Sequence, residues 1–281
     1  MTGAAGLVAG TNQHYDIDPE VFGLFLDPLR KYSSALYESP DDTLATAQER
    51  KLRFVASRLE LADGERLLDV GCGWGSLLLF MAREYRCRVH GISPAPRQHD
   101  YIAARAAELG VAGLVSTQAG YFERADLPEG GFDAVSMLGS IVHMPDLGVA
   151  FGKARRMLRR GGRLYVSESC FRNGVARETF DRRTGTQFVR DAIFGWGDMR
   201  PLSALIAGAE DAGFSIVAVD DLTAHYQRTI EDWLVNVRAA RPRIEKLAPG
   251  YAAALERYLL IANAGWGYTT KHYALTCRNA R

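Results

Sequence analysis

The chain has 281 residues, 34 Lys and Arg against 33 Asp and Glu, and 47% hydrophobic residues. This composition is typical of a globular domain, and a formal charge of +1 argues against nucleic-acid binding through a general excess of positive charge. No apolar run approaches the ~20 residues that cross a bilayer. The N-terminus lacks a secretory signal, and the four cysteines form no C-x-x-C pair. We therefore expect a cytoplasmic protein without disulfides or a metal site.

Residues 19–61 carry apolar side chains at helical spacing, and the turn-rich stretch 38–42 interrupts them. This pattern predicts two or three helices ahead of the first strand. We expect them to form an N-terminal cap, residues 1–60, on a single domain whose core comprises residues 61–281.

Short apolar runs alternate with helical patterns from residue 66 onward. The expected strands are 66–70, 88–92, 114–118, 132–138 and 163–169, and the expected helices are 76–85, 97–109 and 148–159. Strands separated by such helices form a parallel sheet that is covered on both faces.

Residues 170–200 have no clear period and contain five aromatic residues and, before Arg200, five arginines. We expect a lid inserted over the sheet, whose aromatic side chains form a small core of their own or line a dry acceptor pocket. The arginines form a solvated face, or they bind a carboxylate or diphosphate of the substrate.

The last third of the chain predicts a helix at 202–212, a strand at 214–220, two helices within 229–260 and a strand within 267–277. The two helices, at about residues 226–262, would complete the lid. The final strands would close the sheet as an antiparallel hairpin.

The most informative stretch, residues 67–75, reads Leu-Leu-Asp-Val-Gly-Cys-Gly-Trp-Gly where the first strand meets its helix. Glycines let the backbone turn sharply and approach a ligand, and the helix N-terminus offers unpaired N–H groups. Ligands of open parallel sheets bind at the carboxyl ends of the strands. We expect a nucleotide-like cofactor here; the alternative is a tight turn in a domain that binds none.

The spacing of the glycines distinguishes between cofactors. Dinucleotide-binding proteins use G-x-G-x-x-G and an acid about 20 residues later. Here Gly75 falls one place early, and the second expected strand ends at Ser93 without an acid. No G-K-[ST] follows the loop. These features argue against NAD and against a phosphate-binding P-loop.

The glycine turn, together with Phe-Asp-Ala-Val at 132–135 and the Gly-Gly turn at 161–162, resembles the class I S-adenosylmethionine-dependent methyltransferases. More narrowly, the chain resembles the cyclopropane fatty acid synthase and mycolic acid methyltransferase group. Its matching segments are 14–16, 25–28, 32–37, the Gly-Cys-Gly-Trp-Gly-Ser-Leu run, and 225–226 with Trp233. The resemblance implies an α/β, Rossmann-like fold: a mostly parallel seven-stranded sheet with helices on both faces and a helical lid.

The resemblance also implies a site for S-adenosyl-L-methionine. Its expected residues are Tyr15, Tyr32, Ser33, Asp69, Gly71, Gly73, Ser93, Gln98, Tyr121 and Leu138. Tyr15, Tyr32 and Ser33 would lie against the carboxylate and sulfonium end of the cofactor. Tyr121 would pack on the adenine, where the group usually has tryptophan.

Three positions depart from the group. Cyclopropane synthases of this group hold a bicarbonate through a cysteine, a glutamate and a histidine. The matching positions here are Ser34, Val142 beside His143, and Ser167. We infer that the bicarbonate cradle is absent and that this chain does not close cyclopropane rings by that route.

Glu168 is the first catalytic candidate because it ends the expected fifth strand, where sites of this architecture open. A carboxylate buried without a partner costs several kcal/mol, so it should have a partner or a function. The alternatives are a base or cation stabiliser, a structural pair with an arginine of the lid, or an exposed position.

His143 and Tyr226 are the other catalytic candidates. His143 would accept a proton or orient the acceptor, or else cap the next helix. Tyr226 matches a family tyrosine that faces the acceptor, or it is a packing residue of the lid.

We therefore predict an enzyme that methylates a small, largely apolar acceptor, at carbon, in specialised or lipid metabolism. N- or O-methylation, cyclopropane formation through an altered base, and a non-catalytic cofactor-binding protein are the alternatives. No metal, nucleic acid or integral membrane segment is expected.

Overall fold

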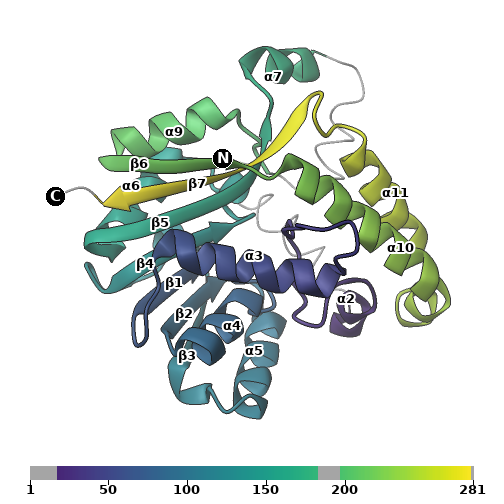
Figure 1. Cartoon of the computed structure of the whole chain (residues 1–281), viewed down its shortest axis with the longest axis horizontal. Helices are drawn as coiled ribbons and strands as arrows, with labels where there is room; N and C mark the ends of the chain where they lie inside the picture. The colour runs from purple at the N-terminus through teal and green to yellow at the C-terminus, as the bar shows by residue number, and fades with distance from the viewer. Residues whose placement is uncertain (1–17, 183–196, 280–281) are drawn as a thin grey trace, which may run out of the picture.

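The computed structural model describes residues 18–182 and 197–279. These residues form one seven-stranded β-sheet with helices packed around it (Figure 1). The strands lie in the order β3-β2-β1-β4-β5-β7-β6. Their bounds are β1 Arg66–Val70, β2 Arg88–Ser93, β3 Val115–Ala119, β4 Phe132–Leu138, β5 Leu158–Phe171, β6 Phe214–Asp221 and β7 Thr270–Asn279.

Strands β1 to β5 run parallel, and β7 runs antiparallel to both β5 and β6. The mostly parallel sheet is confirmed. The predicted hairpin is wrong in its connection, because α10 and α11 separate β6 from β7 along the chain. The two strands still pair, since a long helical excursion returns β7 between β5 and β6.

Two layers of helices cover the sheet. The described helices are α2 Pro19–Phe25, α3 Leu44–Leu59, α4 Ser76–Tyr85, α5 Pro96–Glu108, α6 Leu147–Met157, α7 Gly174–Asp181, α9 Leu202–Asp211, α10 Thr223–Leu247 and α11 Tyr251–Asn263, with 3-10 turns η1 Ala112–Leu114, η2 Phe122–Arg124 and η3 Ile141–His143. Neighbouring residues of a strand point to opposite layers: Leu67 packs in a core with α3, α4 and α5, and Leu68 packs in a core with α6 and α9.

Most predicted elements lie within a few residues of their expected bounds. The helix predicted at 148–159 ends at Met157, because β5 begins at Leu158 and turns through Gly161, whose φ is +76°. At its other end β5 continues to Phe171, so the first two residues of the predicted lid insertion belong to the sheet.

A third cluster of side chains joins α2 to the lid helices, α10 and α11. The side chain of Asp18 caps α2, and Pro19 occupies its first turn. In Figure 1 these three helices lie together on the right, beyond the carboxyl ends of the parallel strands. This arrangement places a helical cover over the edge of the sheet where the glycine turn lies.

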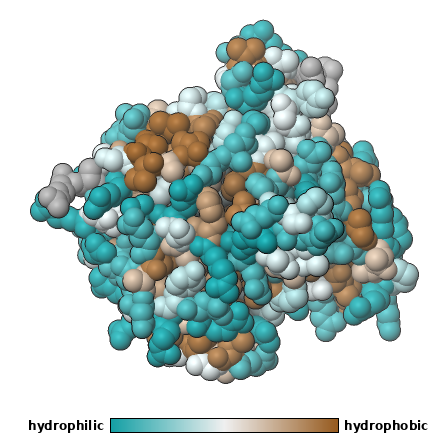
Figure 2. Space-filling view, in the orientation of Figure 1, coloured by the Kyte–Doolittle hydropathy of each residue, from teal (hydrophilic) through white to brown (hydrophobic). Residues whose placement is uncertain are grey.

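The face drawn in Figure 2 is mostly hydrophilic, with hydrophobic areas over α9 and β6 and along α11. Exposed apolar residues on these elements include Val217, Val219 and Leu260. Within the described parts of the chain, no helix combines the length and the apolar character needed to span a bilayer.

Candidate functional site

The glycine turn, residues 71–75, joins β1 to α4 and bends by positive φ angles at each of its glycines. A Cβ atom at Gly71 would stand 2.4 Å from Cβ of Ser140, and one at Gly75 would stand 2.5 Å from Ile102. A Cβ atom at Gly73 would have no neighbour within 4 Å. Gly71 and Gly75 are thus required by packing, whereas Gly73 keeps a space open.

That space belongs to a cavity of about 640 Å³, here called the loop cavity. Its wall includes Ser93, Gln98, Tyr121 and the glycine turn. The Ser93 hydroxyl donates to Oε1 of Gln98 at 3.1 Å, while Nε2 of Gln98 is buried without a hydrogen-bond partner in the described structure. A buried amide donor without a partner indicates a ligand acceptor at this point.

A second cavity of about 510 Å³, here called the chamber, lies between the sheet and the lid helices. Both cavities share wall residues at the turn and at the ends of β4 and α5: Gly71, Gly73, Gln98, Gly139 and His143. A nucleoside with a tail would therefore reach from one into the other.

The expected cofactor residues fall into four groups, of which the first lines the loop cavity: Gly71, Gly73, Ser93, Gln98 and Tyr121. Tyr32, Ser33 and Leu138 line the chamber. Asp69 lies below the wall in β1, where its Oδ1 accepts a hydrogen bond from Ser136 at 2.8 Å. Tyr15 lies outside the described residues.

Two buried lysines were missed by the sequence analysis. Nζ of Lys51 donates to the Ser33 hydroxyl at 3.2 Å, and burial lowers the pKa of both Lys51 and Lys31. Lys31 lines the chamber, is 6% exposed, and its ammonium forms no hydrogen bond or ion pair with the described residues; the charges of Asp69 and Asp27 favour its protonated form. The sequence signal that could have identified Lys31 is its position next to the Tyr32–Ser33 pair.

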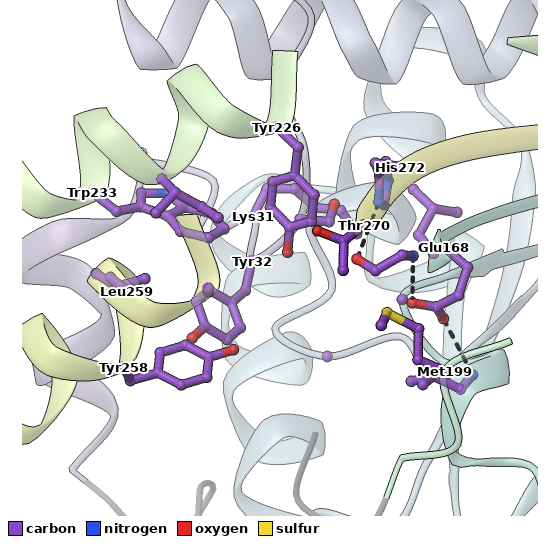
Figure 3. Close-up of a pocket in the computed structure, with 18 of the residues that line it drawn as sticks. Lys31, Tyr32, Glu168, Met199, Tyr226, Trp233, Tyr258, Leu259, Thr270 and His272 are labelled. Atoms are coloured by element: carbon purple, nitrogen blue, oxygen red, sulfur yellow. Dashed lines mark hydrogen bonds between the residues drawn. The ribbon is translucent and has the colours of Figure 1, made fainter. Parts of the chain in front are cut away.

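Glu168 lies in the chamber wall and is 6% exposed. Its carboxylate accepts hydrogen bonds from the backbone N–H of Val142 at 3.2 Å and of Ser169 at 2.9 Å (Figure 3). Burial raises its pKa to about 7, although these two donors and the charge of Arg200 oppose the shift. A carboxyl group with such a pKa can exchange a proton near neutral pH.

The exposed alternative for Glu168 is wrong, because the side chain is buried. No arginine of the described residues forms an ion pair with it, whereas Arg183 and Arg190 of the predicted lid lie outside those residues. Arg200 instead pairs with Asp198 at 3.1 Å and donates to the carbonyls of Met144 and Pro145.

His143 ends the 3-10 turn η3 and lines both cavities. The N-cap of the following helix is Asp146, whose side chain accepts a hydrogen bond from the N–H of Val149. Because His143 lines both cavities, it lies where they join.

Tyr226 of α10 is the centre of an aromatic wall to which α10, the segment after α11 and β7 contribute. Its ring lies 6.0 Å from that of Trp233, 5.0 Å from that of Trp266 and 4.6 Å from that of His272. Trp233 in turn lies 4.9 Å from Tyr32. In Figure 3 the tyrosines face Glu168 across the chamber.

His272 on β7 was also missed, since nothing in an alternating strand sequence marks it. Its Nε2 lies 2.8 Å from Oγ of Ser167, and its Nδ1 lies 3.3 Å from Oγ of Ser169. Burial lowers the pKa of His272 to about 3. It is therefore a neutral wall residue that orients the end of β5.

The described part of the lid insertion contributes little to the chamber. Phe171 and Phe180 pack together at 5.2 Å, and Phe180 reaches the chamber wall. Arg177 pairs with Asp198 at 3.0 Å, and Arg182 pairs with Glu178 at 3.5 Å. The remaining aromatics of that segment, Phe188, Phe194 and Trp196, and two of its arginines, Arg183 and Arg190, lie outside the described residues.

Comparison with known proteins gives a family. The family model described as mycolic acid cyclopropane synthetase matches residues 7–274. A probable fatty acid methyltransferase of Pseudomonas putida is 32% identical over 91% of this chain, and the methyltransferase UmaA of Mycobacterium tuberculosis is 31% identical over 82% of it. The chain spans 64% of the first relative and 82% of the second.

The fold has close counterparts among solved structures. The mycolic acid cyclopropane synthase CmaA1, solved with SAH and CTAB, superposes with a TM-score of 0.86 at 24% identity, covering 96% of this chain and 98% of the other. At this identity the likeness concerns the fold, and it confirms the predicted class I methyltransferase architecture.

Proposed function

This chain belongs to the mycolic acid cyclopropane synthetase family, and we propose that it transfers a methyl group from S-adenosylmethionine to a carbon atom of a largely apolar, unsaturated acceptor. The observation that carries the proposal is the carboxylate of Glu168, buried in the wall of a chamber that opens on the glycine turn. Relatives described as a fatty acid methyltransferase and as a sphingolipid C9-methyltransferase support a lipid or lipid-like acceptor.

The described residues fit S-adenosylmethionine at four points. Gly73 leaves the space that a cofactor needs, Gln98 offers a buried Nε2 donor, and Lys31 offers an ammonium to a carboxylate. The Tyr121 ring stands at the wall of the loop cavity, where an adenine would pack. When bound, the cofactor supplies an electrophilic methyl group.

The work of the protein is to position the acceptor, exclude water and manage charge. The faces of Tyr226 and Tyr32 are suited to a positive charge that forms on the acceptor when an alkene carbon is methylated. Oε2 or Oε1 of Glu168 would take the proton that leaves a neighbouring carbon of the acceptor, and the alkene would form again. His143, at the junction of the cavities, is the second group placed to hold that proton.

Cyclopropane formation is the main competitor, because the family model carries that description. In this chain, the side chains at two positions that hold bicarbonate in the group form hydrogen bonds within the protein. The Ser34 hydroxyl donates to the carbonyl of Ala35, and the Ser167 hydroxyl lies against His272. Both arrangements support methylation with Glu168 as base. N- and O-methylation and a non-catalytic role stay as alternatives.

The test uses S-adenosylmethionine with a fully deuterated methyl group and a panel of unsaturated lipids, with products analysed by mass spectrometry and NMR. Methylation with proton loss from a neighbouring carbon retains every methyl deuterium and the alkene. A cyclopropane retains one deuterium fewer and loses the alkene. Methylation at nitrogen or oxygen, or no turnover with any acceptor although the cofactor binds, would contradict the proposal.

A further inference from the structure

The acceptor side of the chamber is rich in phenol groups. Four tyrosines line it: Tyr32, Tyr226, Tyr251 and Tyr258. Tyr32 is 37% exposed although protein surrounds it, so its exposed surface faces the chamber. Figure 3 shows the hydroxyls of Tyr32 and Tyr258 pointing toward each other and that of Tyr226 pointing into the same space.

Several polar atoms of this wall have no partner in the described structure. The hydroxyls of Tyr226 and Tyr251 form no hydrogen bond there, and Oγ1 of Thr270 and Nε1 of Trp266 are buried without one. Phenylalanine would provide the same aromatic face without a hydroxyl to desolvate, and buried polar groups are normally satisfied. The phenols therefore indicate a ligand that brings hydrogen-bonding atoms of its own.

The charges of the described chamber residues disfavour an anionic group in that place. Its cations among the described residues, Arg30 and Lys31, belong to the cofactor side: Arg30 stacks 4.4 Å over the ring of Tyr101, and Lys31 faces the charges of Asp69 and Asp27. Glu168 lines the chamber and acts electrostatically on Tyr226. A carboxylate or diphosphate beside the tyrosines would thus meet a like charge without a counter-charge from the described residues.

From this arrangement we infer that the acceptor carries an uncharged oxygen, a hydroxyl or a carbonyl, which is bound inside the chamber by Tyr226 and the tyrosines of α11. The inference rests on the proposed function and specifies its substrate class: an unsaturated neutral lipid alcohol, ketone or aldehyde. An ionised fatty acid or a prenyl diphosphate does not belong to this class.

The experiment measures binding to the protein saturated with S-adenosylhomocysteine, by quenching of the fluorescence of Trp233 and Trp266. The probes share one skeleton and differ in one group: geraniol, geranic acid, geranyl diphosphate and the parent hydrocarbon 2,6-dimethylocta-2,6-diene, with oleyl alcohol, oleate and cis-9-octadecene as a longer series. We expect the alcohols to bind about tenfold or more tightly than the anions.

Variants then locate the oxygen. Tyr226→Phe and Tyr251→Phe should each weaken alcohol binding by about threefold to tenfold and leave hydrocarbon binding unchanged, as the loss of one hydrogen bond predicts. Tyr85→Phe is the matched control, since Tyr85 ends α4, is partly buried against the core and does not line the chamber. Equal or tighter binding of an anionic probe, or equal losses for alcohol and hydrocarbon, would overturn the inference.

The binding assay tests the substrate class and the turnover assay tests the proposed function, so a negative result in one does not decide the other. Efficient methylation of an anionic acceptor would overturn the substrate class and leave the proposed function standing. A preference for alcohols with no methylation of any acceptor would support the substrate class and count against the proposed function.

Discussion

Nε2 of His272 lies 2.8 Å from Oγ of Ser167. Ser167 occupies the position at which the cyclopropane synthases that this chain resembles have a histidine of the fifth strand. An imidazole is thus present at this place, but it comes from β7, the antiparallel neighbour of β5. The hydroxyls of Ser167 and Ser169 lie within hydrogen-bond distance of its two nitrogens, and burial keeps the ring neutral. The neighbouring Glu168 is then the ionisable group of β5 that faces the chamber.

Replacement of His272 should change how stability depends on pH. Burial lowers its pKa to about 3, whereas an unfolded histidine titrates at about 6.5. Below that pH the unfolded chain binds a proton that the folded chain refuses, so the free energy of unfolding falls as pH falls. We expect His272→Gln to melt below the wild type at pH 7.5, with the gap closing toward pH 4.5. A difference in melting temperature that stays constant from pH 7.5 to pH 4.5 would contradict a lowered pKa for His272.

Replacement of Gly73 should remove cofactor binding without removing the fold. A methyl group at this position meets no protein atom and enters the loop cavity, whereas a φ of +54° adds only the modest strain of a left-handed residue. Gly73→Ala should therefore lower the affinity for S-adenosylhomocysteine in calorimetry by about tenfold or more. Gly130→Ala is the matched control, since Gly130 has a φ of +61° and open space in an exposed turn. Equal affinities in the two variants would refute the cofactor site.

Replacement of Lys31 should weaken the binding of ligands that carry a carboxylate more than the binding of ligands that lack one. Lys31→Met should weaken S-adenosylhomocysteine binding by about tenfold or more, and it should leave 5′-methylthioadenosine, which lacks the carboxylate, nearly unaffected. Because burial lowers the pKa of Lys31, affinity for S-adenosylhomocysteine should also fall as pH rises and the ammonium loses its proton. Lys246→Met, on the exposed end of α10, serves as the control. Similar losses for both ligands would assign Lys31 to the scaffold.

Glu168→Gln tests the proposed base. Turnover should fall by about 10² to 10⁴-fold with cofactor affinity intact, the usual range for general bases. Since the pKa of Glu168 is about 7, the wild-type rate should rise as pH increases through that value and the carboxylate forms. The rate of Glu168→Gln should not rise with pH in this range. The control variant Glu210→Gln, on α9, should show the same rise as the wild type. A near wild-type rate with a lowered Tm would make Glu168 structural and move the proposed proton acceptor to His143.

The sequence alone determined the order of the elements and the place of the cofactor loop. Alternating apolar runs and helical spacing predicted the first four strands to within a residue or two, because these patterns reflect burial along a single element. The glycine turn predicted the loop cavity for a similar local reason: positive φ angles at Gly71, Gly73 and Gly75 are available mainly to glycine.

The tertiary structure decided which side chains share a chamber. Lys31, His272 and Tyr251 lie in segments that are far apart in the chain, and their roles depend on the crossover that inserts β7 beside β5 and lays α11 over the sheet. The state of Glu168 was likewise decided in three dimensions. Its burial, its two backbone donors and the absence of an arginine partner within the described structure result from packing between η3, β5 and the lid, and no local pattern in a sequence reports such packing.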